Sequence, residues 1–448
     1  MERIDLEANN IKNALNKSQA YQTGFNSSLV TTRTDLFLVV LLLALSGNPV
    51  VMGQPFIDLI LIGVAVFLGV LVFVHHKRFF TKRFFVAVGL FGTILLVQCV
   101  QLSFYPIITI AGFYTRLFIG YAIYRLVKNF PLVYVRAMFY LAILSLVLYV
   151  SREISSFSGF DIMSVLGPLE KIFGMLESRA SFKLLLHTFP KTIGNQHRNA
   201  GMFWEPGAFA GYLILALIFL AFLKNDLPKP GYRRYLFILS GTLLTTLSTT
   251  GFIAFMLVPL LHYDWHSHSK LHTIGRFLVG IYLVIPLLVG GFLYAYNNIH
   301  FLKEKISTQL YSLEVRKTGW HRGRVGSLIF DMEYIQRRPL TGWGLHSQTR
   351  YSLHPWMEES EGMGNGMSDF TAKFGISGMV IWLFMTFQRM RILSGRRVAK
   401  SLLVMGIILL VLQGEAFLGF PLFLGLMFLY VPRYSRYKDH KSTVSGVI

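Results

Sequence analysis

The stretch QHRNAGMFWEPG, residues 196–207, stands directly before a long apolar run that begins near Ala208. It places an imidazole, a guanidinium, an indole and a carboxylate close together, at His197, Arg198, Trp204 and Glu205. Because the following run is long enough to enter a bilayer, these polar groups lie at a predicted membrane edge. Ionisable groups in that position are costly and mark functional sites by default. We predict that the stretch forms half of a site, and that residues 297–370 supply the other half.

The composition predicts an integral membrane protein built of helices. Of the 448 residues, 53% are hydrophobic and only 15% are charged, and the mean hydropathy is +0.52. A soluble domain would carry roughly 25% charged residues. Apolar runs of about 20 residues recur between Leu36 and Tyr430, and each is long enough to cross the hydrocarbon core. Continuous runs indicate helices rather than the alternating pattern of a membrane β-barrel.

The apolar runs predict an all-α, polytopic fold with about twelve transmembrane helices. The predicted spans lie near 36–52, 56–74, 84–100, 105–124, 137–150, 207–223, 235–249, 251–264, 277–296, 371–388, 401–414 and 416–431. The seventh and eighth spans, and also the last two, are separated by very few residues. These pairs are interpreted as tight hairpins or broken helices. Eleven and thirteen crossings are therefore alternatives to twelve.

The spans divide the chain into membrane, outer and cytoplasmic segments. The N-terminal 34 residues lack the apolar core of a cleavable signal and are predicted to be a cytoplasmic tail. The predicted segments are the tail 1–34, transmembrane helices 35–150, an outer loop 151–206, transmembrane helices 207–296, a large outer loop 297–370, transmembrane helices 371–432 and a cytoplasmic tail 433–448.

The net charge of +21 is explained mainly by topology. The predicted cytoplasmic segments hold 26 of the 43 Lys and Arg residues, and most of these segments are short, where the positive-inside rule applies. The charge therefore does not indicate a nucleic-acid partner. Topology leaves the arginines of the outer loops unexplained.

The two outer loops have different patterns. The first carries apolar residues at helical spacing over 165–176, which predicts an amphipathic helix lying on the membrane surface or covering the bundle. The second contains Arg322 and Arg324, then a predicted helix from about Gly326 to Arg338 that Pro339 ends. Further along this loop, Asn365 is predicted to cap the tenth span.

The order of these parts resembles the O-antigen polymerase and ligase superfamily, the Wzy and WaaL type of membrane glycosyltransferase. The resemblance covers the chain from about residue 36 to 431. The family's motif leading into a middle span is similar to Arg198, Gly201, Phe203, Glu205 and Pro206. A short span with small hydroxyl residues resembles 247–251, an Arg-helix-Pro-x-x-Gly-x-Gly element matches Arg324, Pro339, Gly342 and Gly344, and a closing element resembles 365–378.

Two departures from the ligase pattern favour a polymerase. Ligases of this superfamily usually carry a His-Asn pair in the closing element, whereas Gly364 precedes Asn365 here. The first motif has Glu205-Pro206 in place of the Asn-Pro typical of ligases. The resemblance therefore implies a GT-C-like repeat-unit polymerase, with ligation to lipid A-core or protein as the alternative. A lipid-linked glycan flippase or transporter stays open as a different class, although no internal symmetry typical of transporters is visible.

The resemblance implies a glycan donor carried on undecaprenyl pyrophosphate, in the bacterial plasma membrane, with the site on the outer face. A chain-length regulator is an expected partner, beside the bilayer itself. Arginines suit a leaving group that gains negative charge, because guanidinium grips phosphate oxygens bidentately. A base such as Glu or His suits an acceptor hydroxyl that must lose a proton. We expect no cofactor and no metal. The predicted catalytic residues are Arg198, Glu205, Arg324 and His197, and the predicted substrate-binding residues are Arg116, Arg322, Trp204, Asn365, Gly342 and Gly344.

Four of these residues also have a structural interpretation. Arg198 could extend to lipid headgroups, Arg324 could be a solvated loop charge, and Glu205 could only favour the helix N-terminus. Arg116 lies in the middle of a span, where it could pair with an acid such as Glu415. The histidines at 262, 266, 268 and 272 resemble a metal-binding tract, but the predicted topology makes them a solvated cytoplasmic loop.

Overall fold

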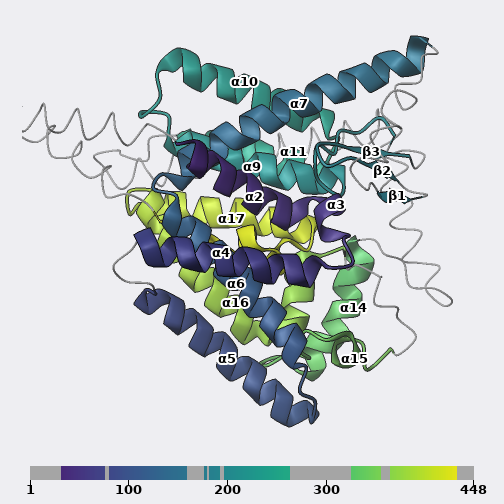
Figure 1. Ribbon diagram of the computed structural model, residues 1–448, viewed down its shortest axis with the longest axis vertical. Coiled ribbons are helices and arrows are strands. Elements are labelled where there is room, and N and C mark those ends of the chain that lie inside the picture. The colour runs from purple at the N-terminus through teal and green to yellow at the C-terminus, as the bar shows by residue number, and fades with distance from the viewer. Residues whose placement is uncertain are drawn as a thin grey trace, which may run out of the picture.

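The structure is a computed structural model that describes residues 32–75, 80–158, 176–178, 181–191, 196–262, 324–354 and 364–430. Helices run side by side through these residues (Figure 1). The helices of the first part are α2 (Arg33–Gly47), α3 (Pro49–Met52), α4 (Ile57–His75), α5 (Lys82–Leu102), α6 (Ile107–Leu126) and α7 (Phe130–Ser158). Polar residues cap three of them: the Thr32 hydroxyl and Asp35 form a capping box at α2, Asn48 caps α3, and Thr81 caps α5.

A small antiparallel sheet and a second group of helices follow. The sheet has the order β1-β2-β3, with β1 (Leu176–Ser178), β2 (Ser181–Lys183) and β3 (Thr188–Pro190). The remaining elements are α9 (Pro206–Phe222), α10 (Lys229–Thr245), α11 (Thr249–Leu257), η1 (Val258–His262), α14 (Arg324–Arg337), α15 (Ser347–Arg350), α16 (Gly366–Leu393), α17 (Val398–Gly414), η2 (Phe417–Gly419), α18 (Pro421–Gly425) and η3 (Leu426–Phe428).

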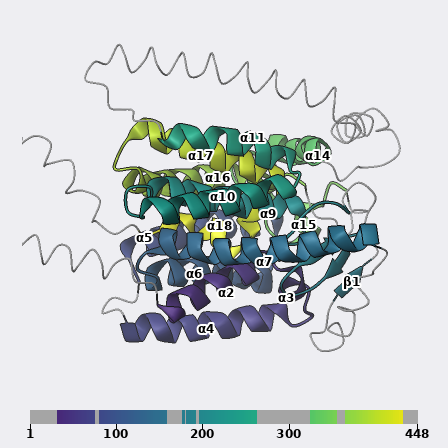
Figure 2. The same cartoon turned by 90° about the horizontal axis from the view of Figure 1, so that it is seen from above.

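Helix α9 is the centre of the bundle. Figures 1 and 2 place it in the middle in both views, and α7, α10, α11 and α17 all pack against it. Every residue from Pro206 to Ala221 is buried, which fits a helix whose sequence is apolar all round. In lipid, helices associate through close packing rather than through the hydrophobic effect. Gly211 permits that packing, because a side chain there would collide with the ring of Phe417.

The described helices support a multi-pass membrane protein. Five are long and apolar enough to cross a membrane: Ile57–His75, Lys82–Leu102, Ile107–Leu126, Phe130–Ser155 and Gly366–Leu393. The apolar helices α9 and α17 and the α11–η1 segment are shorter. Helical segments also lie in the other predicted spans, except for 277–296, which is outside the described residues. The count of twelve therefore stays a prediction.

The first outer loop differs from the prediction in two respects. Helix α7 continues to Ser158 instead of ending near residue 150, because 151–158 contains neither Pro nor Gly before Gly159. The three-stranded sheet was not predicted in an all-α fold. It forms because Phe182, Leu184 and Phe189 make a small apolar cluster of their own against Leu148. The predicted amphipathic helix at 165–176 lies outside the described residues, apart from Leu176 in β1.

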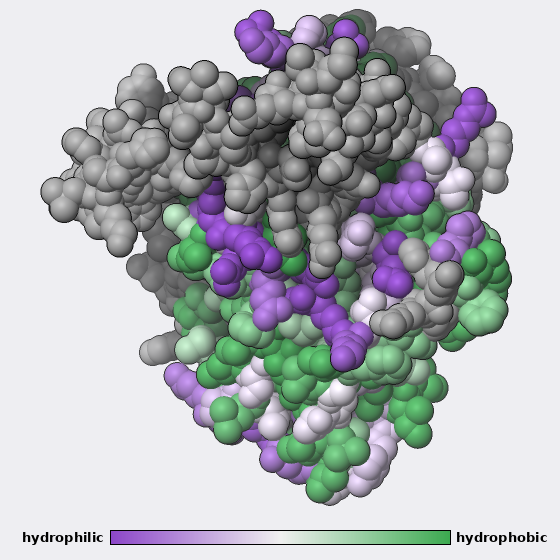
Figure 3. All heavy atoms as spheres, turned by 90° about the vertical axis from the view of Figure 1, so that its left-hand side faces the viewer, coloured by the Kyte–Doolittle hydropathy of each residue, from purple (hydrophilic) through white to green (hydrophobic). Residues whose placement is uncertain are grey.

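The two ends of the bundle have different character. The strands, α14 and α15 lie at one end, on the right in Figure 1. Lys224, Arg397 and Lys400 lie at the opposite end, where they line one cavity beyond the ends of α9 and α17. Figure 3 looks onto that opposite end and shows hydrophilic residues gathered across it above a mainly hydrophobic part. This basic end matches the face that the sequence assigns to the cytoplasm.

Candidate functional site

The loop 196–205 is anchored to the C-terminal end of α10. The amide of Asn199 donates to the carbonyl of Thr245 at 3.0 Å, and Arg198 Nε donates to the carbonyl of Thr246 at 3.0 Å. Gly201 turns the chain at a φ of 53°, in the left-handed region that glycine adopts without strain. These contacts hold Arg198 inside the protein, where the residue is only 7% exposed.

The end of the loop leads directly into α9. The ring of Phe203 stacks on that of Tyr212, with 4.1 Å between the ring centroids. Glu205 then occupies the N-cap position and Pro206 the first turn, where its fixed φ suits a helix start. The Glu205 carboxylate does not cap the helix amides. It lies instead at the positive end of the helix dipole, beside residues from distant parts of the chain.

Arg324 reaches this point from the start of α14. Its Nε donates to the carbonyl of Gly414 at 3.0 Å, and its Nη1 donates to the Thr250 hydroxyl at 2.8 Å. Its Nη2 donates to Glu415 Oε1 at 3.3 Å. Each guanidinium nitrogen therefore has a partner, and the partners come from α11, the end of α17 and the turn after it. This arrangement fixes the position of the positive charge.

Side chains from several elements contact the carboxyl group of Glu415. It lies in the turn between α17 and η2 and is 8% exposed. Trp204 Nε1 donates to Glu415 Oε2 at 3.2 Å. The carboxyl group of Glu205 is also in hydrogen-bonding contact with that of Glu415. The side chains of residues 196–207 and of residues 297–370 thus meet at the N-terminal end of α9.

Gly207 leaves the room for this meeting. A Cβ atom at this position would lie 2.7 Å from Glu415 Oε1 and 3.0 Å from both Arg324 Nη2 and Glu205 Oε1. The first distance is too short for an added methyl group, and the other two are tight contacts. Glycine at residue 207 therefore lets the two carboxyl groups and the guanidinium come together without displacement.

The charges of the cluster act on one another. Burial lowers the pKa of Arg198 to about 10, and the positive charge of Arg324 adds to this effect, whereas Glu205 and Glu415 oppose it. Arg198 nevertheless stays positive at neutral pH. Burial raises the pKa of Glu415 well above its usual range, and the neighbouring Glu205 adds to the rise while Arg324 opposes it. We name Arg198, Trp204, Glu205, Arg324 and Glu415 the outer charge cluster, after the side of the membrane on which the predicted topology places them.

The structure brings together four of the residues predicted from sequence, namely Arg198, Trp204, Glu205 and Arg324. His197 is adjacent in sequence but points elsewhere. Its Nδ1 lies 2.9 Å from Glu153 Oε2 near the end of α7, and its side chain is 58% exposed. A role of His197 as a base stays a prediction, without support from its position.

Arg116 and Asn365 lie outside the outer charge cluster. Arg116 Nη2 is 3.9 Å from Asp58 Oδ1, so the suggested pairing of Arg116 with Glu415 is wrong. The reason is that α6 packs on α4, which carries Asp58 in its first turn, while Arg324 is the partner of Glu415. Asn365 caps α16 as predicted, with its Oδ1 accepting from the Ser368 amide at 3.1 Å.

Gly342 and Gly344 lie where the turn after α14 crosses a break in α16. Gly342 has a φ of 74°, Gly344 a φ of 85°, and Gly375 in α16 a φ of 71°. The amide of Gly344 donates to the carbonyl of Lys373 at 3.0 Å, and that of Ile376 to the carbonyl of Pro339 at 2.7 Å. These glycines therefore allow two backbones to approach. Their predicted substrate-binding role stays a prediction, as does that of Arg322, which lies outside the described residues.

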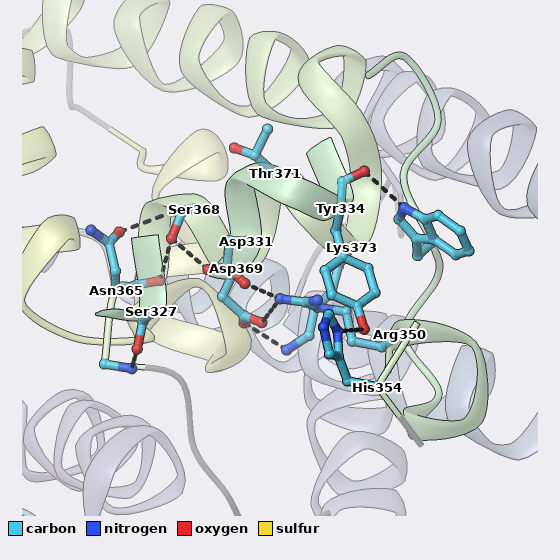
Figure 4. A network of polar contacts seen from close by, with 12 residues as sticks. Ser327, Asp331, Tyr334, Arg350, His354, Asn365, Ser368, Asp369, Thr371 and Lys373 are labelled. Carbon is cyan, nitrogen blue, oxygen red and sulfur yellow. Dashed lines mark hydrogen bonds and ion pairs between the residues drawn. The ribbon is translucent and has the colours of Figure 1, made fainter. Parts of the chain in front are cut away.

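A second group of charges, which sequence reasoning missed, joins α14, α15 and α16 (Figure 4). Arg350 is 1% exposed and forms ion pairs with Asp331 and, at 3.4 Å, with Asp369. Lys373 Nζ lies 2.6 Å from Asp369 Oδ2, and the Ser368 hydroxyl donates to Asp331 Oδ2 at 2.5 Å. We name Asp331, Arg350, Ser368, Asp369 and Lys373 the buried ion network.

The buried ion network has features of a structural element. Burial raises the pKa of Asp331 to about 6, although Arg350 opposes the rise. The Arg350 guanidinium also lies over the ring of Tyr334, 4.8 Å from its centroid. The network holds α14 against α16, and Arg324 is the first residue of α14. The position of Arg324 within the outer charge cluster therefore depends on the buried ion network.

Comparison with known families gives one match. Residues 235–383 match the model of the Wzy_C family, described as O-antigen ligase. The match supports the resemblance to the O-antigen polymerase and ligase superfamily and does not distinguish the polymerase type from the ligase type. It supports a polysaccharide-related transferase of this class. No curated protein matches the chain.

The matched segment covers only part of the outer charge cluster. It includes Arg324 and the whole buried ion network, but it ends before Glu415 and begins after the loop that carries Arg198 and Glu205. The grouping of these side chains is therefore seen in the structure and does not come from the family match. Chemically, it offers fixed positive charge for an anion beside carboxyl groups that can take up a proton.

Proposed function

We propose that this membrane protein is a repeat-unit polymerase for a bacterial surface polysaccharide. It transfers a glycan from undecaprenyl pyrophosphate onto a second repeat unit that is still bound to its own carrier. The observation that carries the proposal is the meeting of Arg198 and Arg324 with Glu205 and Glu415 at the outer end of α9. The residues come from segments far apart in the sequence.

The arginines suit the donor. When the bond between the anomeric carbon and the pyrophosphate breaks, negative charge grows on the phosphate oxygens. Arg198 is buried and positive, and Arg324 is oriented through all its guanidinium nitrogens, so their charge needs little rearrangement during the reaction. Preorganised charge of this kind usually contributes more to catalysis than any other single effect.

Glu205 suits the acceptor. The acceptor hydroxyl oxygen attacks the anomeric carbon, its proton passes to the Glu205 carboxylate, and the carrier pyrophosphate leaves with the bonding electron pair. The products are a longer glycan on the acceptor carrier and free undecaprenyl pyrophosphate. Glu205 is half-buried at the start of α9, whereas the alternative base, His197, is paired with Glu153. General base catalysis contributes typically about 100- to 10,000-fold in rate.

The polymerase is favoured over the ligase by two positions in the sequence. Gly364 stands where ligases usually carry a histidine, and Glu205 stands where they carry asparagine. The ligase remains the second candidate, because the matching family is described as O-antigen ligase. We place the reaction on the outer face of the bacterial plasma membrane, opposite to the basic end of the bundle, with a chain-length regulator as an expected partner.

The test is an assay with the purified full-length protein in lipid nanodiscs. It receives synthetic carrier-linked repeat units, with no nucleotide sugar and no ion gradient, in buffer that contains a metal chelator. We expect a ladder of longer carrier-linked glycans on a gel. Transfer to lipid A-core without a ladder would support the ligase instead. Unchanged glycan length, together with movement of the glycan across the membrane, would support a transporter.

A further inference from the structure

Two carboxyl groups occupy one end of the outer charge cluster. Glu205 Oε1 and Glu415 Oε1 lie within 3.0 Å and 2.7 Å of the same point, the place where a Cβ of Gly207 would stand. The two carboxyl groups are in hydrogen-bonding contact. Two adjacent carboxylates cannot both be ionised without strong repulsion, and a shared proton removes that repulsion.

Burial decides which group holds the proton. Glu415 is 8% exposed, whereas Glu205 is half-buried at the helix N-terminus. Trp204 Nε1 donates to Glu415 at 3.2 Å and opposes the effect of burial. Burial in a medium of low dielectric constant disfavours the charged form of a carboxyl group, so the more enclosed Glu415 is the proton carrier.

We propose that Glu415 is a protonated positioning residue, whose O–H donates to Glu205 and aims that carboxylate for its role as base. The proposal rests on the function proposed above and adds a residue to it. In the resting pair, Glu415 carries one proton and Glu205 none. Glu205 then accepts the proton of the acceptor hydroxyl, and that second proton passes to water after product release.

The proton on Glu415 also sets the charge that the donor meets. With Glu415 neutral, Arg198 and Arg324 outnumber the single carboxylate, so the cluster keeps a net positive charge for a pyrophosphate. With Glu415 ionised, the two carboxylates would cancel the two arginines. The groups that face Glu415 come from four places: Glu205, Trp204 and Tyr212 from α9 and the residues before it, Arg198 from the preceding loop, Arg324 from α14 and, through Arg324, the Thr250 hydroxyl of α11.

The pH dependence of this arrangement has a defined sign. Burial raises the pKa of Glu415, and its proton is lost as the pH rises through the raised pKa. The proposal places this loss above neutral pH. Polymerisation should therefore fall on the alkaline side. The profile is measured from pH 6 to pH 9, because the pKa of Arg198 is about 10 and that residue stays positive over this range.

The experiment compares Glu415→Gln with Glu205→Gln by initial rate of ladder formation, in nanodiscs at matched protein amount. An amide resembles a protonated carboxyl group but cannot titrate. We expect Glu415→Gln to lose less than about tenfold at pH 7 and to lack the alkaline decline, whereas Glu205→Gln should lose about 100-fold or more. Glu333→Gln on α14 is the matched control, because Glu333 pairs only with surface Arg337 and His354 among the described contacts. It should keep the wild-type profile.

A second measurement does not depend on activity. Infrared difference spectra at pH 7 should show the C=O stretch of a protonated carboxyl group that disappears in Glu415→Gln and persists in Glu333→Gln. Absence of that band, or an unchanged alkaline decline in Glu415→Gln, would overturn the proposal. If the wild-type protein forms no ladder but shows the band, the shared proton stands and the polymerase function fails.

Discussion

The Arg324 guanidinium lies 3.3 Å from the carboxyl group of Glu415, although 91 positions separate the two residues in the sequence. Arg324 belongs to a polar outer loop, and Glu415 to a turn between two apolar segments. Their contact joins the last third of the chain to the start of α9, through the Trp204 indole on the other oxygen of Glu415.

Replacement of either arginine by lysine should nearly abolish polymerisation. Lysine keeps the charge but loses the planar, two-pronged geometry. Loss of one well-placed donor to a developing oxyanion costs typically about 100- to 1,000-fold in rate. We expect losses of that size for Arg198→Lys and Arg324→Lys in the ladder assay. The control Arg337→Lys, at an exposed pair with Glu333 on the same helix as Arg324, should be near wild type. Wild-type rates in Arg198→Lys would remove that residue from the site.

Gly207→Ala should damage activity without unfolding the protein. The added methyl group would stand 2.7 Å from Glu415 Oε1 and would push the carboxyl groups and Arg324 apart. A displacement of about 1 Å near a reacting group can cost about 100-fold in rate. Gly241→Ala in α10 is the matched control, because a Cβ there meets no atom within 4 Å. Equal rates for the two variants would show that close approach at residue 207 is not required.

Asp331→Ala should lower the thermal stability of the protein in detergent. It would leave the buried Arg350 with only the longer contact to Asp369, and breaking a buried ion pair on one side typically costs about 3–5 kcal/mol. Glu333→Ala, two residues further along α14, removes an exposed pair of small value and serves as control. The readout is the unfolding temperature by intrinsic fluorescence. A midpoint equal to that of the control would exclude a stabilising network.

The orientation of the bundle can be checked by cysteine labelling of intact cells. In a Cys99→Ser background, Lys191→Cys after β3 should react with a membrane-impermeant maleimide, because Lys191 is exposed beside the outer loop. Ala399→Cys, exposed in the first turn of α17, should react only after the cells are opened. Labelling of Ala399→Cys from outside would reverse the orientation and place the outer charge cluster on the cytoplasmic face.

The meeting of the two motifs was predictable from sequence, because Arg198, Glu205 and Arg324 are polar residues placed beside apolar spans. Glu415 carries a weaker signal. A single acid between two apolar runs must find a partner, but the sequence does not say which arginine that is, and Arg116 was an equally reasonable choice. Packing decided the matter, since α6 contacts α4 and its Asp58.

The buried ion network was harder to foresee. Asp331 and Arg350 stand in segments of mixed polarity, where a charged residue is ordinarily exposed to solvent. Two features of the sequence were available as signals for this network. Arg324 and Asp331 lie two turns apart on one helix, and Asp369 lies at the start of a membrane span. The sheet at 176–190 was missed because each strand has only three residues, too few for a clear alternation.

The enclosure of α9 on every side constrains how the chain can be assembled during synthesis. Its neighbour α7 is made before it, whereas α10, α11 and α17 are made after it. A nascent chain that has released α9 but not α17 must therefore leave the face around Gly211 against lipid or against the insertion machinery. Completion of the bundle waits for almost the whole polypeptide, and the turn at Glu415 arrives with the same final piece. The last side of α9 is therefore covered, and the charged cluster completed, in one late step of biogenesis.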